Sequence, residues 1–195
     1  MHSDEAGMTE LAKRVAEGLA RLESADLETR VRAVEALARC SEAIVDRVAQ
    51  VAAEDEAARF LVFERIRGFG SLSVAAVERV YREAEDASLR LMSASVLLEL
   101  GNRAGVPDLM AALGDQGQRL STAALSLSDA GIEEAAGPIE EALMACDFAD
   151  RRMLDDLATS LRRLRNPLPE RVQERLSRVE PAWFRESLLG RLGPY

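Results

Sequence analysis

An aspartate followed four residues later by an arginine recurs five times, and this motif constrains the fold more than any other feature. The arginines of successive pairs are separated by 29, 31, 29 and 32 residues. The pairs are Asp26/Arg30, Asp55/Arg59, Asp86/Arg90, Asp115/Arg119 and Asp147/Arg151. Self-similarity at a nearly constant period of this length is typical of repeat proteins, in which each repeat packs on its neighbours.

Each arginine is followed by an apolar stretch with helical periodicity and then by a second, shorter helical segment. Gly70 and Gly101 both lie eleven residues after their arginine, where a helix C-cap is expected. Alternating strand patterns are absent from the sequence. We therefore predict an all-α chain of helical hairpins. The first helices are expected at 31–38, 60–66, 91–100, 120–127 and 153–164, and the second at 43–52, 74–83, 106–113, 135–144 and 169–179.

The repeated Asp/Arg pairs are interpreted as structural. An aspartate at the start of a first helix can cap its free N–H groups. The arginine lies one turn further on, where it can reach the capping aspartate or loop carbonyls of a neighbouring repeat. We therefore expect a ladder of charge-assisted hydrogen bonds along the stack of repeats.

The segment 86–113 carries a resemblance to a known family. It combines the Asp-containing turn, an apolar-Arg pair, an Ala-rich helix ending in Leu-Gly, then Val-Pro-x-Leu and a closing Leu. This pattern resembles the short HEAT-like repeat first described in phycobilisome lyases. The resemblance implies an α-solenoid, or superhelix, of about five HEAT-like helical-hairpin repeats with a capping helix at each end. The repeats are expected at residues 26–54, 55–85, 86–114, 115–146 and 147–179.

The two ends of the chain are expected to differ from the repeats. Residues 1–7 are polar and predict a disordered leader without a signal peptide. Residues 8–25 predict an amphipathic N-terminal capping helix, and residues 180–195 a C-terminal one. Trp183 and Phe184 are adjacent aromatics that either plug the end of the core or make Trp183 a binding anchor.

The residue types argue against catalysis and for a soluble, cytoplasmic protein. His2 is the single histidine, so Ser-His-Asp, Cys-His and His-metal chemistry are not expected. Cys40 and Cys146 form no C-x-x-C motif, so we expect free thiols, no metal and no cofactor. The formal net charge of -9 disfavours nucleic-acid binding and docking on an anionic membrane.

A non-catalytic scaffold or adaptor that binds a protein, possibly a basic one, on its concave face is therefore the leading prediction. The alternatives are a lyase subunit or chaperone of the phycobilin lyase type, an immunity or antitoxin-like binder of a basic protein, and a DNA-binding HEAT-like glycosylase. The repeat motif predicts no oligomeric state. The expected contact residues lie on second helices; they are Asp46, Arg47, Gln50, Glu78, Arg79, Asp108, Glu140, Glu141 and Glu174.

Overall fold

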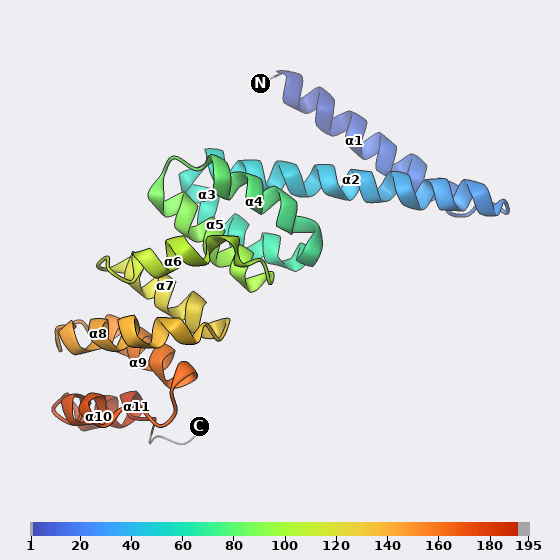
Figure 1. Ribbon diagram of the computed structural model, residues 1–195. Helices are drawn as coiled ribbons and strands as arrows, with labels where there is room; N and C mark the ends of the chain where they lie inside the picture. The colour runs from blue at the N-terminus through green and yellow to red at the C-terminus, as the bar shows by residue number, and fades with distance from the viewer. Residues whose placement is uncertain (1, 191–195) are drawn as a thin grey trace. The chain divides into compact units, whose positions relative to one another are not determined.

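The computed structural model describes residues 2–190, and every regular element in that range is helical (Figure 1). The all-α class predicted from the sequence is confirmed. The chain forms two compact units, residues 1–76 and 77–195. Within the described range, no helix has the length and apolar character needed to cross a bilayer.

The first unit is built on one long helix. Its elements are α1 (His2–Arg21), α2 (Leu27–Glu54), α3 (Glu56–Ile66), η1 (Arg67–Ser73) and the beginning of α4 (Val74–Glu83). Helices α1, α3 and η1 all pack on α2. The α1–α2 contact is close, because a Cβ added to Gly18 would lie 2.8 Å from Cδ2 of Leu37.

The expected disordered leader over residues 1–7 is wrong for the part that the structure describes. Helix α1 already begins at His2, and Met1 lies outside the described residues. Residues 2–7 contain no proline that would interrupt a helix. The N-terminal helix is therefore longer than the predicted capping helix over 8–25.

The first predicted repeat, residues 26–54, is also wrong as a hairpin, because α2 runs without interruption through the expected turn. The position eleven residues after Arg30 is Ser41 and not a glycine. The Ser41 hydroxyl donates to the carbonyl of Leu37 at 3.1 Å, which a continuous helix accommodates. Gly70 and Gly101, in contrast, adopt positive φ values of 57° and 84°; Gly101 follows the end of α5, and Gly70 interrupts the helical backbone between α3 and α4.

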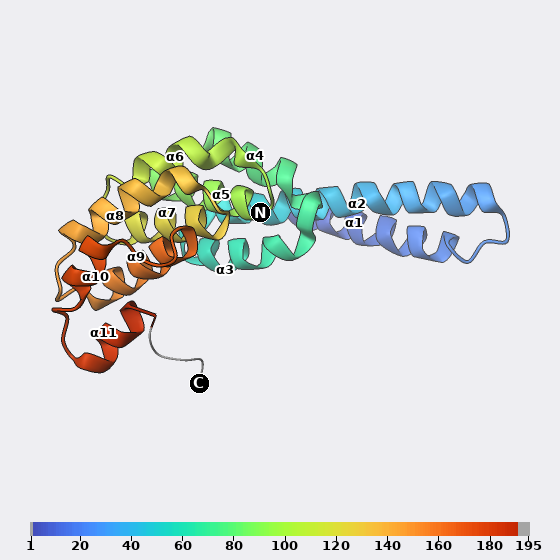
Figure 2. The same ribbon diagram turned by 60° about the horizontal axis from the view of Figure 1, so that its bottom comes forward.

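The second unit consists of helical hairpins that pack in order along the chain. Helix α5 contacts α7, and α7 contacts α9. Helix α6 packs on α5 and α7, α8 packs on α9, and α10 packs on α8 (Figure 2). The elements after α4 are α5 (Ala87–Glu99), η2 (Arg103–Gly105), α6 (Val106–Ala112), α7 (Gln118–Asp129), η3 (Glu133–Ala135), α8 (Ala136–Ala145), α9 (Arg151–Leu164), α10 (Glu170–Leu176) and α11 (Ala182–Leu188).

Small residues let the helices of this unit approach closely. Ser95 on α5 and Ser126 on α7 are buried, and their hydroxyl oxygens lie 2.7 Å apart in a hydrogen bond. Gly105 lies against Ala94, so that an added Cβ would be 2.5 Å from the Ala94 Cβ. The core thus relies on close packing of Ala, Ser and Gly between larger Leu and Ile side chains.

The predicted aspartate caps are confirmed for three repeats and wrong for two. Asp26, Asp55 and Asp86 accept hydrogen bonds from the first backbone N–H groups of α2, α3 and α5. Helix α7 instead begins after Gly117, whose φ of 63° turns the chain beyond Asp115. Helix α9 is capped by Asp150, because the preceding loop is longer and Asp147 accepts from Ala149 within it.

The arginines of the motif do not form a uniform ladder. Arg59 donates through Nε to the carbonyl of Ala52, which lies in the last turn of α2 and not in a loop. Arg119 pairs with its own Asp115, Arg90 pairs with Asp108, and Arg151 lies over the Phe184 ring. Arg90 and Arg119 thus pair within their own predicted repeats, whereas Arg59 and Arg151 contact groups outside theirs.

The C-terminal helix α11 separates the two adjacent aromatics. Phe184 is buried, whereas Trp183 is 61% exposed, with ring centroids 5.6 Å apart. Phe184 therefore contributes to the core and Trp183 does not. Residues 191–195 of the expected capping helix over 180–195 lie outside the described residues.

Candidate functional site

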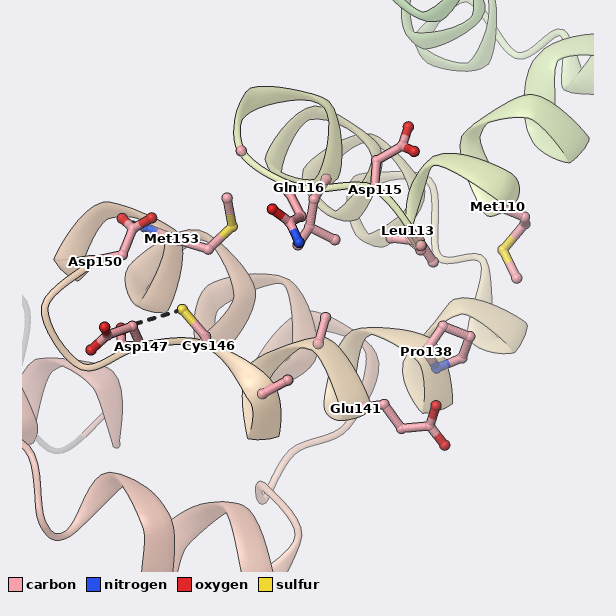
Figure 3. Close-up of a pocket in the computed structure, with 15 residues that line it drawn as sticks. Met110, Leu113, Asp115, Gln116, Pro138, Glu141, Cys146, Asp147, Asp150 and Met153 are labelled. Carbon is pink, nitrogen blue, oxygen red and sulfur yellow. Dashed lines mark hydrogen bonds between the residues drawn. The ribbon is translucent and has the colours of Figure 1, made fainter.

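The second unit contains an open cavity of about 740 Å³ where two hairpins meet. Its walls come from α6, the loop that leads into α7, the outer face of α8, and the loop that leads into α9 (Figure 3). We call it the α6–α9 cavity. Its lining residues are Met110, Leu113, Gly114, Asp115, Gln116, Gly117, Leu120, Pro138, Glu141, Ala142, Ala145, Cys146, Asp147, Asp150 and Met153.

The floor of the cavity is apolar and exists because α8 presents small residues there. Ala142 and Ala145 share one face of α8 with Pro138, as their helical spacing requires. The larger Ile139 and Leu143 point the other way and are buried in the core. Methionine and leucine side chains complete the floor from the neighbouring elements.

The rim of the cavity is acidic. Asp115, Glu141, Asp147 and Asp150 line it, and no lysine, arginine or histidine belongs to the described lining. Arg119 neutralises Asp115 at 2.9 Å, while the other three carboxylates lie on exposed residues. The result is a local excess of negative charge above an apolar surface.

Cys146 lies in this cavity as a neutral thiol. Burial raises the pKa of the Cys146 thiol, and the carboxylates of Asp150 and Asp147 raise that pKa further. Arg175 opposes these effects. The Cys146 Sγ lies 3.5 Å from the carbonyl oxygen of Asp147 (Figure 3). A thiol with a raised pKa is a poor nucleophile at neutral pH.

Arg175 on α10 holds the loop between α8 and α9 in place. Its guanidinium donates to the carbonyls of Leu143, at 3.3 Å, and Cys146. The same group lies 4.5 Å from the centre of the Phe148 ring. These contacts join the end of α8 to the next hairpin and fix the wall that carries Asp147 and Asp150.

A second, smaller cavity continues from the first along α6. It has a volume of about 380 Å³ and shares Met110 with the α6–α9 cavity. Its lining includes Val106, Pro107 and Ile132, together with one arginine and one glutamate. The second cavity therefore adjoins the first at Met110, and three of the four carboxylates that line the first lie on α8 and the loop before α9.

The structure distributes the predicted contact residues over two units. Asp46, Arg47 and Gln50 lie on α2 in the first unit, where the Gln50 amide donates to Glu54 at 2.7 Å. The remaining predicted residues belong to the second unit.

In the second unit, the predicted residues have different surroundings. Glu78 is half-buried and pairs with Arg82, Arg79 is exposed on the same helix, and the exposed Glu174 pairs with Arg178 at 2.8 Å. Asp108 lines a third, smaller cavity, and Glu141 lines the α6–α9 cavity.

Glu140 does not face outward as predicted. It is 4% exposed and accepts hydrogen bonds from Arg171 and, at 3.1 Å, from Arg165. A buried carboxylate with two guanidinium partners is held in a structural contact. We therefore remove Glu140 from the candidate interface, because its side chain is already occupied.

The sequence pattern marks none of Met110, Cys146, Asp150 and Met153 as site residues, and it predicts only a structural role for Asp147. One signal pointed to this region. The step from Arg119 to Arg151 is the longest of the four, which indicates a longer loop before α9. That loop carries Asp147 and Asp150, and it forms one side of the cavity.

Among the residues that the structure describes, no group of three or more His, Cys, Asp or Glu side chains is arranged to hold a metal ion. Comparisons of this chain with protein-family models, with curated proteins and with solved structures find no match.

Proposed function

We propose that this protein is a non-catalytic scaffold or adaptor that binds a basic, partly apolar protein segment in the α6–α9 cavity. The observation that carries the proposal is the combination of an apolar floor with an acidic, cation-free lining. The HEAT-like α-solenoid suggested by the repeat motif agrees with this function, because stacked hairpins offer extended binding surfaces.

Lysine and arginine side chains match such a cavity chemically. Their aliphatic stems can lie on Met110, Ala142 and Met153 while their charged heads reach carboxylates at the rim. Guanidinium–carboxylate hydrogen bonds would then fix the orientation of the segment. The negative charge would also speed the encounter with a basic partner, so we expect binding to weaken with salt.

The proposal is tested with the full chain and a set of synthetic amphipathic peptides rich in Arg, Lys and Leu. Peptides of the same length with Glu in place of Arg and Lys serve as the comparison. We expect saturable binding of the basic set alone, measured by fluorescence anisotropy at low and high salt. Equal binding of both sets, or of neither, would contradict the proposal.

A charge-removing variant locates the site. Glu141→Gln, Asp147→Asn and Asp150→Asn together remove three negative charges but keep acceptors for the hydrogen bonds from Ala149 and Met153. We expect affinity to fall by about tenfold or more. The matched control is the triple variant Glu83→Gln, Glu85→Gln and Asp155→Asn. It changes the net charge by the same amount, at exposed positions outside the cavity. An equal loss in the control would place binding elsewhere.

A further inference from the structure

The first unit leaves a large apolar surface uncovered. Of ten large apolar side chains that are exposed in the described part of the chain, nine lie between residues 19 and 72. Three of them, Leu27, Val31 and Val34, follow one another on the N-terminal half of α2 at helical spacing. Their exposed fractions are 65%, 48% and 57%. We call these three residues and the exposed Ala38 the α2 stripe.

The same face of α2 is buried further along the helix. Eighteen residues make five turns of an α-helix, so Leu27, Val31 and Val34 have the same orientation about the axis as Val45, Ala49 and Ala52. The latter three are buried. They lie in the part of α2 on which α3 and η1 pack (Figure 1). The α2 stripe is therefore the uncovered continuation of a face that elsewhere carries a packed helix.

Helix α1 does not cover the stripe. It packs on the side of α2 marked by Leu37, against which Gly18 lies, and by the buried Ala33 and Cys40. At 100° per residue, that side is about 100° or more around the helix from the stripe. A second helix can therefore lie on the stripe without displacing α1.

The charges beside the stripe identify the partner. Glu28, Arg32, Glu35 and Arg39 flank one edge of the stripe and are all exposed, and Glu28 pairs with Arg32 along its own helix. Along α2 these charges alternate negative, positive, negative, positive, and in the opposite direction they begin with a positive charge. An antiparallel copy of α2 therefore places opposite charges face to face. With a two-fold axis near residue 33, Glu28 faces Arg39 of the second copy, and Arg32 faces Glu35.

The apolar residues are symmetric about a point between residues 32 and 33, one residue from the centre of the charge pairs, so an axis at residue 33 leaves each pair only about 1.5 Å out of register along the helix. Leu27 then lies opposite Ala38 of the second copy, and Val31 lies opposite Val34. We propose that this protein forms a homodimer in which two α2 helices pack antiparallel along their α2 stripes. The contact is isologous, with the same patch on both subunits, as a two-fold axis requires. It is independent of the α6–α9 cavity, which lies in the other unit.

Matched substitutions on α2 test the position of the interface in the full chain. Ala38→Glu places a carboxylate in the stripe, whereas Ala43→Glu makes the same change at an exposed position on the opposite side of the helix. We expect sedimentation equilibrium to show a dimer for the parent chain and for Ala43→Glu. Ala38→Glu should raise the dissociation constant about tenfold or more.

Charge exchange tests the antiparallel orientation. The pair Glu28→Arg with Arg32→Glu, and the pair Glu35→Arg with Arg39→Glu, each keep the net charge but create like-charged contacts across the two-fold axis. Each exchanged protein alone should therefore be mainly monomeric. An equal mixture of the two restores every opposite-charge contact and should form a heterodimer, which native mass spectrometry detects when one protein carries ¹⁵N.

Circular dichroism shows whether each variant keeps the helical content of the parent chain. A parent chain that stays monomeric up to about 100 μM would overturn the proposal. So would a dimer that Ala38→Glu leaves intact. A dimer that either charge exchange leaves intact, or two exchanged proteins that do not associate when mixed, would overturn the antiparallel arrangement.

Discussion

Arg90 donates through Nε to Oδ2 of Asp108 at 2.7 Å, so the repeated arginine joins the first helix of its hairpin to the second. The same carboxylate oxygen accepts from the Tyr81 hydroxyl at 2.8 Å, and the guanidinium lies 5.1 Å from the centre of the Tyr81 ring. Three helices, α4, α5 and α6, therefore meet at one carboxylate. The contact links consecutive hairpins and does not depend on Asp86.

This cluster makes the free energy of unfolding depend on pH. The hydrogen bond from Arg90 lowers the pKa of Asp108 below its ordinary value of 3.8, and burial opposes this effect. A lowered folded-state pKa contributes stability above the unfolded value, and that contribution is lost as the pH falls through the folded value. We expect Asp108→Asn to lower the free energy of unfolding by about 1 kcal/mol near neutral pH.

Urea denaturation at several pH values between neutrality and about pH 3 measures this dependence. The difference between Asp108→Asn and the parent chain should shrink as the pH falls below about 4, because the unfolded state takes up the proton first and stability is lost progressively as the pH approaches the lowered folded-state pKa. A difference that stays constant across this range would show that the charge of Asp108 does not stabilise the fold.

The buried Glu140 predicts an asymmetric pair of mutational effects. Removing its charge leaves two arginines that are about half exposed and remain hydrated, so Glu140→Gln should cost about 1 kcal/mol. Removing both partners, in Arg165→Met with Arg171→Met, leaves a buried carboxylate without a counter-charge and should cost more. Chemical denaturation checks the order. Glu141→Gln, at the exposed neighbouring position, should change the stability little.

Two glycines of the second unit predict stability changes of opposite sign. Gly105→Ala would bring a Cβ within 2.7 Å of the Ala94 Cα, so we expect a loss of about 1–3 kcal/mol. Gly137 lies in α8 with open space around it, so Gly137→Ala should add about 0.5–1 kcal/mol. Thermal melts of the two variants provide the measurement. Equal effects would contradict the close contact between α5 and the turn before α6.

The thiol of Cys146 should react slowly. Because burial and the nearby carboxylates raise its pKa, the thiolate fraction at about pH 8 should be smaller than for an unhindered cysteine. In a Cys40→Ala background, we expect iodoacetamide to alkylate the Cys146 thiol more slowly than it alkylates the thiol of free glutathione. Intact-protein mass spectrometry follows the alkylation of Cys146. Asp147→Asn with Asp150→Asn should increase the rate. A rate equal to that of glutathione in the parent protein would contradict the raised pKa.

The repeat motif predicted most of the helices because helix formation depends on local signals. Apolar spacing, aspartate caps and glycines at helix ends are all contained in short stretches of sequence. Where such a signal is missing, the prediction failed in a specific way. Ser41 occupies the position where the next two repeats have Gly70 and Gly101, and α2 continues through the expected turn.

The sequence by itself determined the helical class, the positions of the later hairpins and the helix near the C-terminal end that carries the two adjacent aromatic residues. Only the tertiary structure decided which charges are available. Glu140 and Glu141 are adjacent in the sequence, yet one is buried between two arginines and the other lines a cavity. Such partners are 25 to 31 residues apart along the chain, and their contact depends on how successive hairpins pack. The cavity and the uncovered α2 stripe have the same origin, because both are defined by which faces the packed helices leave open.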